Sequence, residues 1–131
     1  MLNEVEKMES PYASNAMKGM RAVVCGASKG IGKATAEMFA ACGAEVIGLS
    51  RSAPEMQGIK SVKVDLEDEN ATKEIIANIL DSGPVHILVN NAGGPPGGPL
   101  LSNDSEAFVT PFKRHLHAAH TITRMVVPSM E

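Results

Sequence analysis

A short apolar run followed by a glycine-rich turn is the feature that most limits how this chain can fold. The run, residues 22–25 (Ala-Val-Val-Cys), fits a strand that is buried on both faces of a parallel sheet. Gly26, Gly30 and Gly32 follow it, and a helical pattern begins directly afterwards. Glycine lets backbone N–H groups approach a ligand closely, and a helix N-terminus attracts anions. The stretch therefore predicts a cradle for a pyrophosphate group.

Two other glycine motifs do not fit this turn. A P-loop requires G-x-x-x-x-G-K-[ST], but Ala27 stands where its first glycine belongs and Ala34 where its Ser or Thr belongs. The dinucleotide fingerprint G-x-G-x-x-G fails as well, because Ala27 and Ser28 are not followed by glycines at the required spacing. On this stretch alone, a glycine turn that binds no ligand remains the alternative.

The rest of the chain alternates between strand and helix patterns. We expect further strands at 44–49, 60–65 and 85–89, and helices at about 29–42, 68–80 and 110–127. This alternation predicts an α/β fold, a Rossmann-type doubly wound parallel sheet with helices on both faces and strand order 3-2-1-4, truncated after about four strands. The glycine turn and the end of strand 4 then flank the switch point of the sheet, where ligands bind.

Helix signals allow more detailed expectations. Asp68 or Asn70 would cap the second helix, and Thr110 and Pro111 offer an N-cap and first position for the last helix, which Pro128 would end. The expected apolar stripe of the first helix is Ile31, Thr35, Met38, Phe39 and Cys42. The expected stripe of the last helix is Phe112, Leu116, Ala119, Thr123 and Val126.

The residues that follow the second strand indicate which dinucleotide is bound. An NAD-binding site has Asp or Glu there to accept hydrogen bonds from the ribose hydroxyls, but this chain has Ser50 and Arg51. A guanidinium pairs with a 2′-phosphate, and Lys29 in the glycine turn can reach the same group. The sequence therefore favours NADP(H), with Arg51 as a solvated loop residue the alternative. A methyltransferase-like domain would also need an acid here, so it is disfavoured.

Two motifs together resemble the short-chain dehydrogenase/reductase family. The glycine turn resembles that family's T-G-x-x-x-G-x-G, with Cys25 in place of Thr, and Asn90-Asn91-Ala92-Gly93 resembles its N-N-A-G motif. The resemblance covers residues 21–130 and, within the family, is to the 3-oxoacyl-acyl-carrier-protein reductases. It implies that the pyrophosphate is contacted by Gly26, Ser28, Lys29, Gly30, Ile31 and Gly32, and the 2′-phosphate by Ser50 and Arg51 together with Lys29. It also implies that Asp65 and Leu66 contact the adenine, and that Asn90, Ala92 and Gly93 contact the ribose.

The sequence departs from the family at its catalytic residues. His115 stands where the family has a catalytic-tetrad Asn, as in a divergent branch that also has Gly-Gly-Pro-Pro loops. The family's Ser and Tyr-x-x-x-Lys come later in the chain, and the single Tyr here is Tyr12, with no Lys four residues on. We therefore expect the first half of a longer enzyme, which is inactive alone.

The resulting prediction is NADP(H)-dependent reduction of a carbonyl or 3-oxoacyl group by hydride transfer. Its partners would be a small carbonyl or acyl-carrier substrate of the full-length parent, and a second copy bound through the last helix or the exposed edge of strand 4. The alternative is a non-catalytic dinucleotide-binding or sensing module that acts through a partner. Residues 94–99, rich in Gly and Pro, would be either the substrate mouth or a stiff connector.

Composition excludes several other classes. A net charge of −3 with 3% aromatic residues gives no basis for a nucleic-acid partner, and no apolar run is long enough to span a membrane. Cys25 and Cys42 are expected to be reduced core residues of a cytoplasmic protein. We expect no metal site, because His115 and His117 would point to different faces of one helix. Residues 1–20 are expected to form a flexible arm or tag remnant, and residues 21–131 the partial NADP(H)-binding domain.

Overall fold

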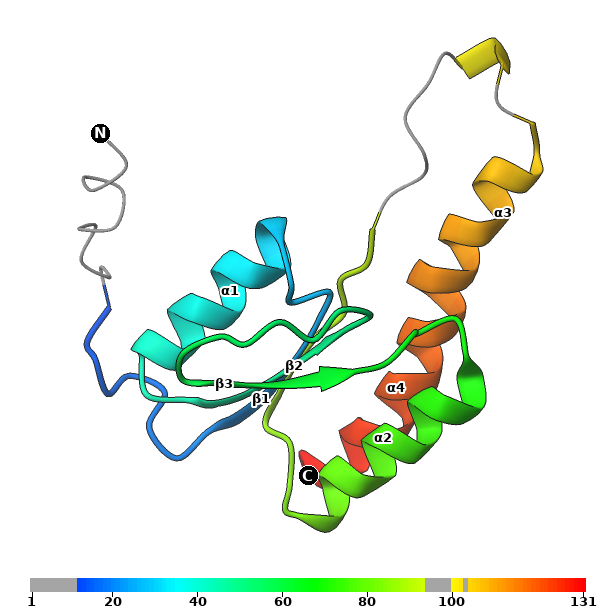
Figure 1. Ribbon diagram of the computed structural model, residues 1–131. Helices are drawn as coiled ribbons and strands as arrows, with labels where there is room; N and C mark the ends of the chain where they lie inside the picture. Colours follow the sequence, from blue (N-terminus) through cyan, green and yellow to red (C-terminus); the bar gives the residue numbers. More distant parts are fainter. Residues whose placement is uncertain (1–11, 94–99, 103) are drawn as a thin grey trace, which may run out of the picture.

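The computed structural model describes residues 12–93, 100–102 and 104–131. It contains a parallel sheet of four strands, which lie in the order β3-β2-β1-β4 (Figure 1). The strands are β1 (Arg21–Cys25), β2 (Glu45–Ser50), β3 (Ile59–Lys63) and β4 (Ile87–Val89). The helices are α1 (Gly30–Ala41), α2 (Glu69–Asp81), α3 (Glu106–Phe112) and α4 (Ala118–Val126), with a π-helical turn η3 (Lys113–His117) and two 3-10 turns, η2 (Leu100–Ser102) and η4 (Val127–Ser129). The predicted Rossmann-type sheet and its strand order are confirmed.

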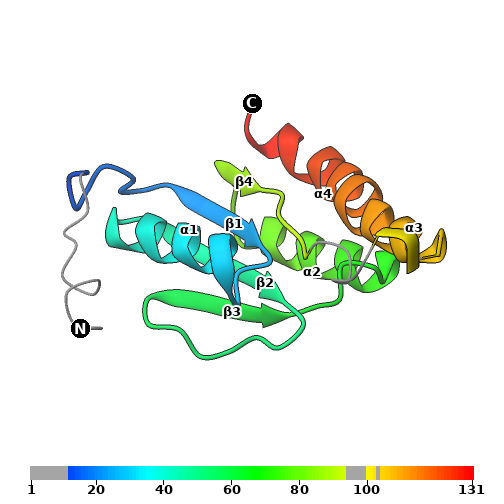
Figure 2. The same cartoon turned by 90° about the horizontal axis from the view of Figure 1, so that it is seen from above.

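The sheet is covered on both faces, as a parallel sheet of apolar strands requires. Figure 2 shows α1 on one face and α2 with α4 on the other. The larger core cluster lies on the α2 and α4 side, and its best buried members include Val23, Ile47, Leu49, Ile76 and Ile122. The smaller cluster lies under α1 and includes Val24, Ala36 and Val46. Alternate residues of β1 and β2 therefore supply both cores.

The first half of helix α1 is rotated by one residue from the expected stripe, whereas in its second half Phe39 packs on the smaller core cluster and Cys42 is buried, as expected. Ile31 is 80% exposed, and Gly32 and Ala36 face the sheet instead. The glycine turn imposes this rotation, because α1 packs closely against the turn only where Gly32 has no side chain. A Cβ on Gly32 would lie 2.7 Å from the carbonyl carbon of Gly26. Helix α2 agrees with prediction: Asp68 caps it by accepting from the Ala71 N–H at 3.0 Å.

The last helical segment starts earlier than predicted. The expected cap at Thr110 and Pro111 is wrong. Asp104, six residues before Thr110, caps the segment, because its side chain accepts from the Ala107 N–H at 3.1 Å. Pro111 consequently lies inside α3, and the π-helical turn η3 follows it directly. A π-turn contains more residues than an α-turn, so it shifts the buried face beyond it.

The predicted stripe of that segment is therefore wrong in its first part. Phe112 and Leu116 are each 63% exposed. The buried residues of α4 are Ala118, Thr121, Ile122 and Val126. Val126 is the member of the predicted stripe that is fully buried, because it lies beyond the π-turn and packs with Ile76 of α2 in the larger core cluster.

Two further features concern the ends of the sheet. The backbone N–H of Met17 donates to the Cys42 carbonyl at 2.8 Å, and Met17 packs on the smaller core cluster, so the described part of the N-terminal arm contacts the end of α1. Arg21 is buried at the start of β1, where its guanidinium donates to the carbonyls of Ile79 and Gly83 at 2.8 and 2.7 Å. Among the described helices, none has the length and hydropathy needed to cross a membrane.

Candidate dinucleotide site

The carboxyl ends of the strands border an open cleft of about 620 Å³. Its walls come from four stretches: the glycine turn, the end of β2, and the segments that follow β3 and β4. Nearly all residues predicted to contact a cofactor line it: Gly26, Ser28, Lys29, Gly30, Ile31, Ser50, Arg51, Asp65, Leu66, Ala92 and Gly93. The fold thus brings together four stretches that are far apart in sequence, at the place where open parallel sheets bind ligands.

The glycine turn is shaped by backbone constraints that a side chain would violate. Gly26 and Gly30 have φ values of +64° and +61°, which L-residues rarely adopt. A Cβ on Gly26 would also lie 2.6 Å from the side-chain nitrogen of Asn91. Gly32 does not line the cleft; its role is to let α1 approach the turn. Gly30 faces open space, since no atom of the described residues lies within 4 Å of its Cβ position.

The N-terminus of α1 is left open to the cleft. Its N-cap residue, Lys29, makes no capping hydrogen bond, and the first turn contains no acidic side chain. The first N–H groups of a helix have no partner within the helix, and the helix dipole favours negative charge there. Because no side chain among the described residues caps this terminus, the turn and helix can hold a phosphate group.

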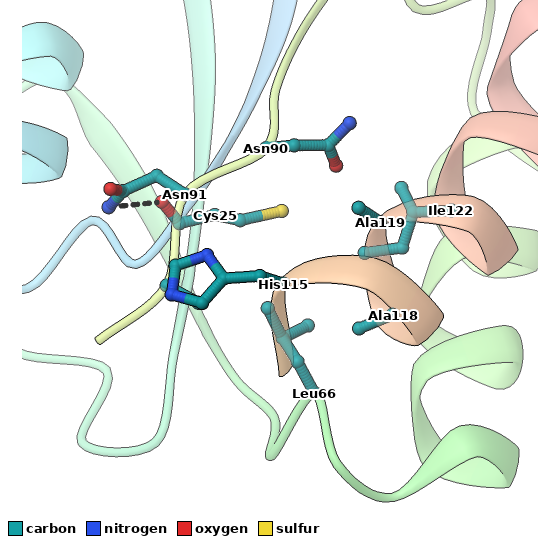
Figure 3. A pocket seen from close by; sticks show the side chains of 9 residues that line it. Cys25, Leu66, Asn90, Asn91, His115, Ala118, Ala119 and Ile122 are labelled. Atoms are coloured by element: carbon teal, nitrogen blue, oxygen red, sulfur yellow. Dashed lines mark hydrogen bonds between the residues drawn. The ribbon is translucent and has the colours of Figure 1, made fainter. Parts of the chain in front are cut away.

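Asn91 is the main residue of this site that the sequence analysis left out of its predicted contacts. Its side-chain amide donates to the carbonyls of Cys25 and Gly26 at 3.3 and 3.4 Å, so it joins the end of β4 to the end of β1 (Figure 3). Asn90 points the other way and donates to the Thr123 hydroxyl of α4 at 3.1 Å. Asn90 therefore does not line the cleft. The N-N-A-G motif contained the signal, because adjacent residues of an extended strand point to opposite sides.

The end of β2 presents a cation to the cleft and no acid. Arg51 is exposed and lines the cleft, as does Lys29 across from it in the glycine turn. Ser50 is buried, and its hydroxyl accepts from the Ala53 N–H at 3.0 Å, which shapes the loop that follows β2. Two positive side chains therefore border the part of the cleft between the glycine turn and β2, where they suit an anionic group.

Asp65 combines a structural contact with a position in the cleft. Its carboxylate accepts from the Glu67 N–H at 3.0 Å, which forms the turn between β3 and α2. Leu66, the next residue, lines the dinucleotide cleft and also a second cavity of about 390 Å³ between α2 and the last helical segment. Asp65 and Leu66 thus form a wall that a flat ring could contact.

His115 lies at the edge of the site, on the π-turn η3. Its Nε2 lies 3.1 Å from the Gly93 carbonyl oxygen, and Figure 3 shows the ring turned toward the end of β4. Together with Cys25, Leu66, Asn90 and Asn91, His115 borders a small hollow of about 20 Å³. That volume has room for about one water molecule. His115 is therefore held against the backbone that follows β4.

The two thiols are core residues, as expected. Cys25 and Cys42 are both buried. Burial raises the pKa of the Cys25 thiol to about 12 from 9.0, partly offset by a hydrogen bond from the backbone of Asn91. A thiol with such a pKa is a poor nucleophile at neutral pH. Cys25 therefore contributes its backbone carbonyl to the site.

His117 lies on the opposite side of the π-turn from His115. Its Nε2 lies 3.2 Å from a carboxylate oxygen of Glu69 in the first turn of α2. The two histidines thus contact different elements, in agreement with the different faces expected from their spacing. Within the described ranges, no group of three or more His, Cys, Asp or Glu side chains could hold a metal ion.

Comparisons with known proteins give a consistent family. The family model for short chain dehydrogenases matches residues 20–131. L-xylulose reductase from Cavia porcellus is 36% identical over 121 residues, 87% of this chain and 48% of its own length. Carbonyl reductase [NADPH] 2 from Sus scrofa is 35% identical over 119 residues, 86% of this chain and 48% of its own. The chain thus spans about half the length of the curated relatives it matches.

A solved structure extends this likeness to the fold. The L-sorbose reductase of Gluconobacter frateurii, complexed with NADPH and L-sorbose, matches with a TM-score of 0.74 at 26% sequence identity. The match covers 90% of this chain and 50% of that one.

Proposed function

The chain belongs to the short-chain dehydrogenase family, and we propose that it forms the NADP(H)-binding part of a carbonyl reductase. Members of this family are oxidoreductases that bind a nicotinamide dinucleotide. NADP(H) is favoured over NAD(H) because two cationic side chains, Lys29 and Arg51, line the same cleft as the glycine turn. The names of two similar proteins, a carbonyl reductase [NADPH] and a reductase complexed with NADPH, support it.

The described residues fit such a cofactor. The uncapped N-terminus of α1 would accept the pyrophosphate, and the positive φ values of Gly26 and Gly30 shape the turn that presents its N–H groups. Lys29 and Arg51 would pair with the 2′-phosphate, which a carboxylate in the place of Ser50 would repel. The backbone around Ala92 and Gly93, held by Asn91, would border the adenosine ribose.

In the reaction, the bound cofactor would supply a hydride to a carbonyl carbon. This chain's residues would bind and orient the cofactor. Its one tyrosine is Tyr12, and no Tyr-x-x-x-Lys occurs in its 131 residues. We therefore propose that these residues bind NADPH without measurable turnover by themselves, since a general acid is needed to protonate the developing alkoxide.

For the substrate of the whole protein, we propose a small hydroxylated ketone. L-xylulose, L-sorbose and carbonyl reductases are named among the similar proteins. The resemblance to 3-oxoacyl-acyl-carrier-protein reductases stays a prediction. Assays of a full-length protein containing this chain, with L-xylulose and with an acetoacetyl thioester, would separate the two classes: faster NADPH oxidation with the thioester would contradict our proposal.

We also propose that the outer face of the last helical segment mediates self-association. Phe108, Phe112 and Leu116 are spaced four apart, and each is at least 40% exposed. An apolar face of this kind is typical of a protein interface. Sedimentation of the chain and of a Phe112→Ser, Leu116→Ser variant tests this: dimers should be lost in the variant, and a monomeric wild type would refute the proposal.

Cofactor binding is tested by titrating the purified chain with NADPH and NADH while nicotinamide fluorescence is recorded, since the chain has no Trp. NADPH should bind at least about tenfold more tightly, as expected for a charge-assisted contact worth about 1.5–3 kcal/mol. Arg51→Ala should remove most of this difference and leave NADH affinity unchanged.

The matched control is Arg124→Ala, which removes an exposed Arg from α4. This variant should keep both affinities. Equal affinity of the wild type for NADPH and NADH, or equal losses in both Arg variants, would refute the 2′-phosphate assignment. No binding of either dinucleotide would refute the proposed cofactor function.

A further inference from the structure

The π-turn η3 is anchored on two opposite sides by two histidines. His115 contacts the Gly93 carbonyl at 3.1 Å, beyond the end of β4. His117 contacts the Glu69 carboxylate at 3.2 Å, in the first turn of α2. One contact borders the dinucleotide cleft, whereas the other lies in the separate cavity between α2 and the last helical segment.

A π-turn needs such contacts to persist. π-helices are rare, and they occur mostly as single turns inside α-helices, frequently at functional sites. The core fixes α4 below the turn, because Ile122 and Val126 are buried against α2 and the sheet. Above the turn, Pro111 interrupts the hydrogen bonds of α3. The register of η3 between them therefore depends on its side-chain anchors.

We propose that His117 and Glu69 are positioning residues for the dinucleotide site: their contact holds η3 in the register that lets His115 reach the Gly93 carbonyl. If the contact is lost, η3 can relax to an α-helical turn. A change of one residue in register rotates a side chain by about 100° around the helix axis. His115 would then turn away from Gly93 and from the wall of the cleft. The consequence for cofactor affinity depends on the proposed function, whereas the contact itself does not.

The surroundings of His117 favour this contact at neutral pH. Lys73 lies 2.6 Å from the other oxygen of Glu69 and holds the pKa of that carboxyl below its usual range, so Glu69 stays an ionised acceptor. Glu67 also borders the cavity between α2 and the last helical segment. The other described histidines of the last helical segment are His115 and His120. The cavity is thus acidic on the α2 side, which suits an imidazole N–H donor.

The test compares variants at exposed positions, so folding is preserved. His117→Ala and Glu69→Ala remove the contact, and Glu69→Gln keeps an acceptor without the charge. Glu74→Ala and His120→Ala are the controls, since they remove an exposed carboxylate of α2 and a nearby histidine, neither of which takes part in the contact. His117 and Glu69 are each about half exposed, with side-chain exposures of 56% and 45%.

The first readout needs no cofactor. Ring ¹⁵N shifts of His115 report its Nε2 hydrogen bond, and amide hydrogen exchange reports opening of residues 113–117. Both alanine variants should shift the His115 Nε2 signal and speed exchange about threefold to fivefold, with Glu69→Gln close to wild type. Unchanged His115 signals and exchange in both alanine variants, or equal changes in the two controls, would overturn the proposal.

The second readout is NADPH affinity, which should fall about threefold to fivefold in the two alanine variants only. An altered His115 signal with unchanged affinity would mean that the contact positions His115 but has no effect on the site, which also overturns the proposal. If the wild type binds no NADPH, the proposed function fails, while the first readout still decides whether His117 and Glu69 position His115.

Discussion

Asn91 at the end of β4 donates its side-chain amide to the Cys25 carbonyl at the end of β1, with 3.3 Å between the two atoms. β1 and β4 are neighbours in the sheet but are separated by more than sixty residues of chain. The same amide reaches Gly26, the first residue of the glycine turn, at 3.4 Å. One side chain thus holds the turn against the segment that forms the opposite wall of the cleft.

Asn91→Ala should weaken NADPH binding about tenfold and lower the free energy of unfolding by about 1 kcal/mol, since two long hydrogen bonds are lost. Urea denaturation and NADPH titration measure the two effects. Asn78→Ala, an exposed change on α2, is the control. If Asn91→Ala binds NADPH as well as wild type, Asn91 does not shape the site.

Gly32→Ala should disrupt the glycine turn. The added Cβ would collide with the Gly26 carbonyl group and would lie 2.8 Å from the Asn91 side-chain nitrogen. We expect a loss of about 1–3 kcal/mol in the free energy of unfolding and no detectable NADPH binding. Lys33→Ala, at the next and exposed position of α1, should leave both unchanged. A stable Gly32→Ala chain that binds NADPH normally would show that the close approach is not required.

Arg21→Met should destabilise the chain by about 2–4 kcal/mol, because it leaves the carbonyls of Ile79 and Gly83 without their buried donor. Glu45 also contacts this guanidinium, at 3.3 Å, but its side chain is 67% exposed. Glu45→Gln should therefore cost less than about 1 kcal/mol. Urea midpoints of the two variants give the comparison, and similar losses in both would mean that the ion pair, rather than the carbonyl contacts, accounts for the role of Arg21.

Stability should fall as the pH rises above 9. Burial raises the pKa of Cys25 in the folded chain to about 12, whereas the ordinary value is 9.0. The folded state keeps its proton between these values and the unfolded state loses it, so the contribution of Cys25 is complete below pH 9 and is lost towards pH 12. Urea midpoints measured from pH 8 to 10.5 should fall less steeply for Cys25→Ala than for wild type. Parallel pH profiles would contradict the pKa shift.

The glycine turn and the residues after each strand could be predicted because their signals are local. An apolar run and the glycines after it define a strand, a turn and a helix start without reference to the rest of the chain. Parallel strands then bring Gly26, Arg51, Asp65 and Gly93 to one edge of the sheet. The exceptions are Gly32, which packs against the glycine turn, and the exposed Asn90, whose side chain donates to Thr123 of α4.

Side-chain direction depended on long-range packing. The sequence contains two adjacent asparagines, and it is the pairing of β4 with β1 that directs Asn91 toward the glycine turn and Asn90 toward α4. The first half of the α1 stripe is rotated by one residue because the close contact at Gly32 takes precedence over burial of Ile31.

The amino-acid sequence alone therefore determines the glycine cradle and the basic end of β2, since each depends on residues close together in the chain. The alternation of strands and helices along the chain also indicates the strand order. Tertiary packing decides the register of the last helical segment. Asp104, Pro111 and the buried Ile122 impose different constraints along it, and the π-turn between them absorbs the mismatch. That turn directs His115 to β4 and His117 to α2, because the register of a helix is set by the elements it packs against.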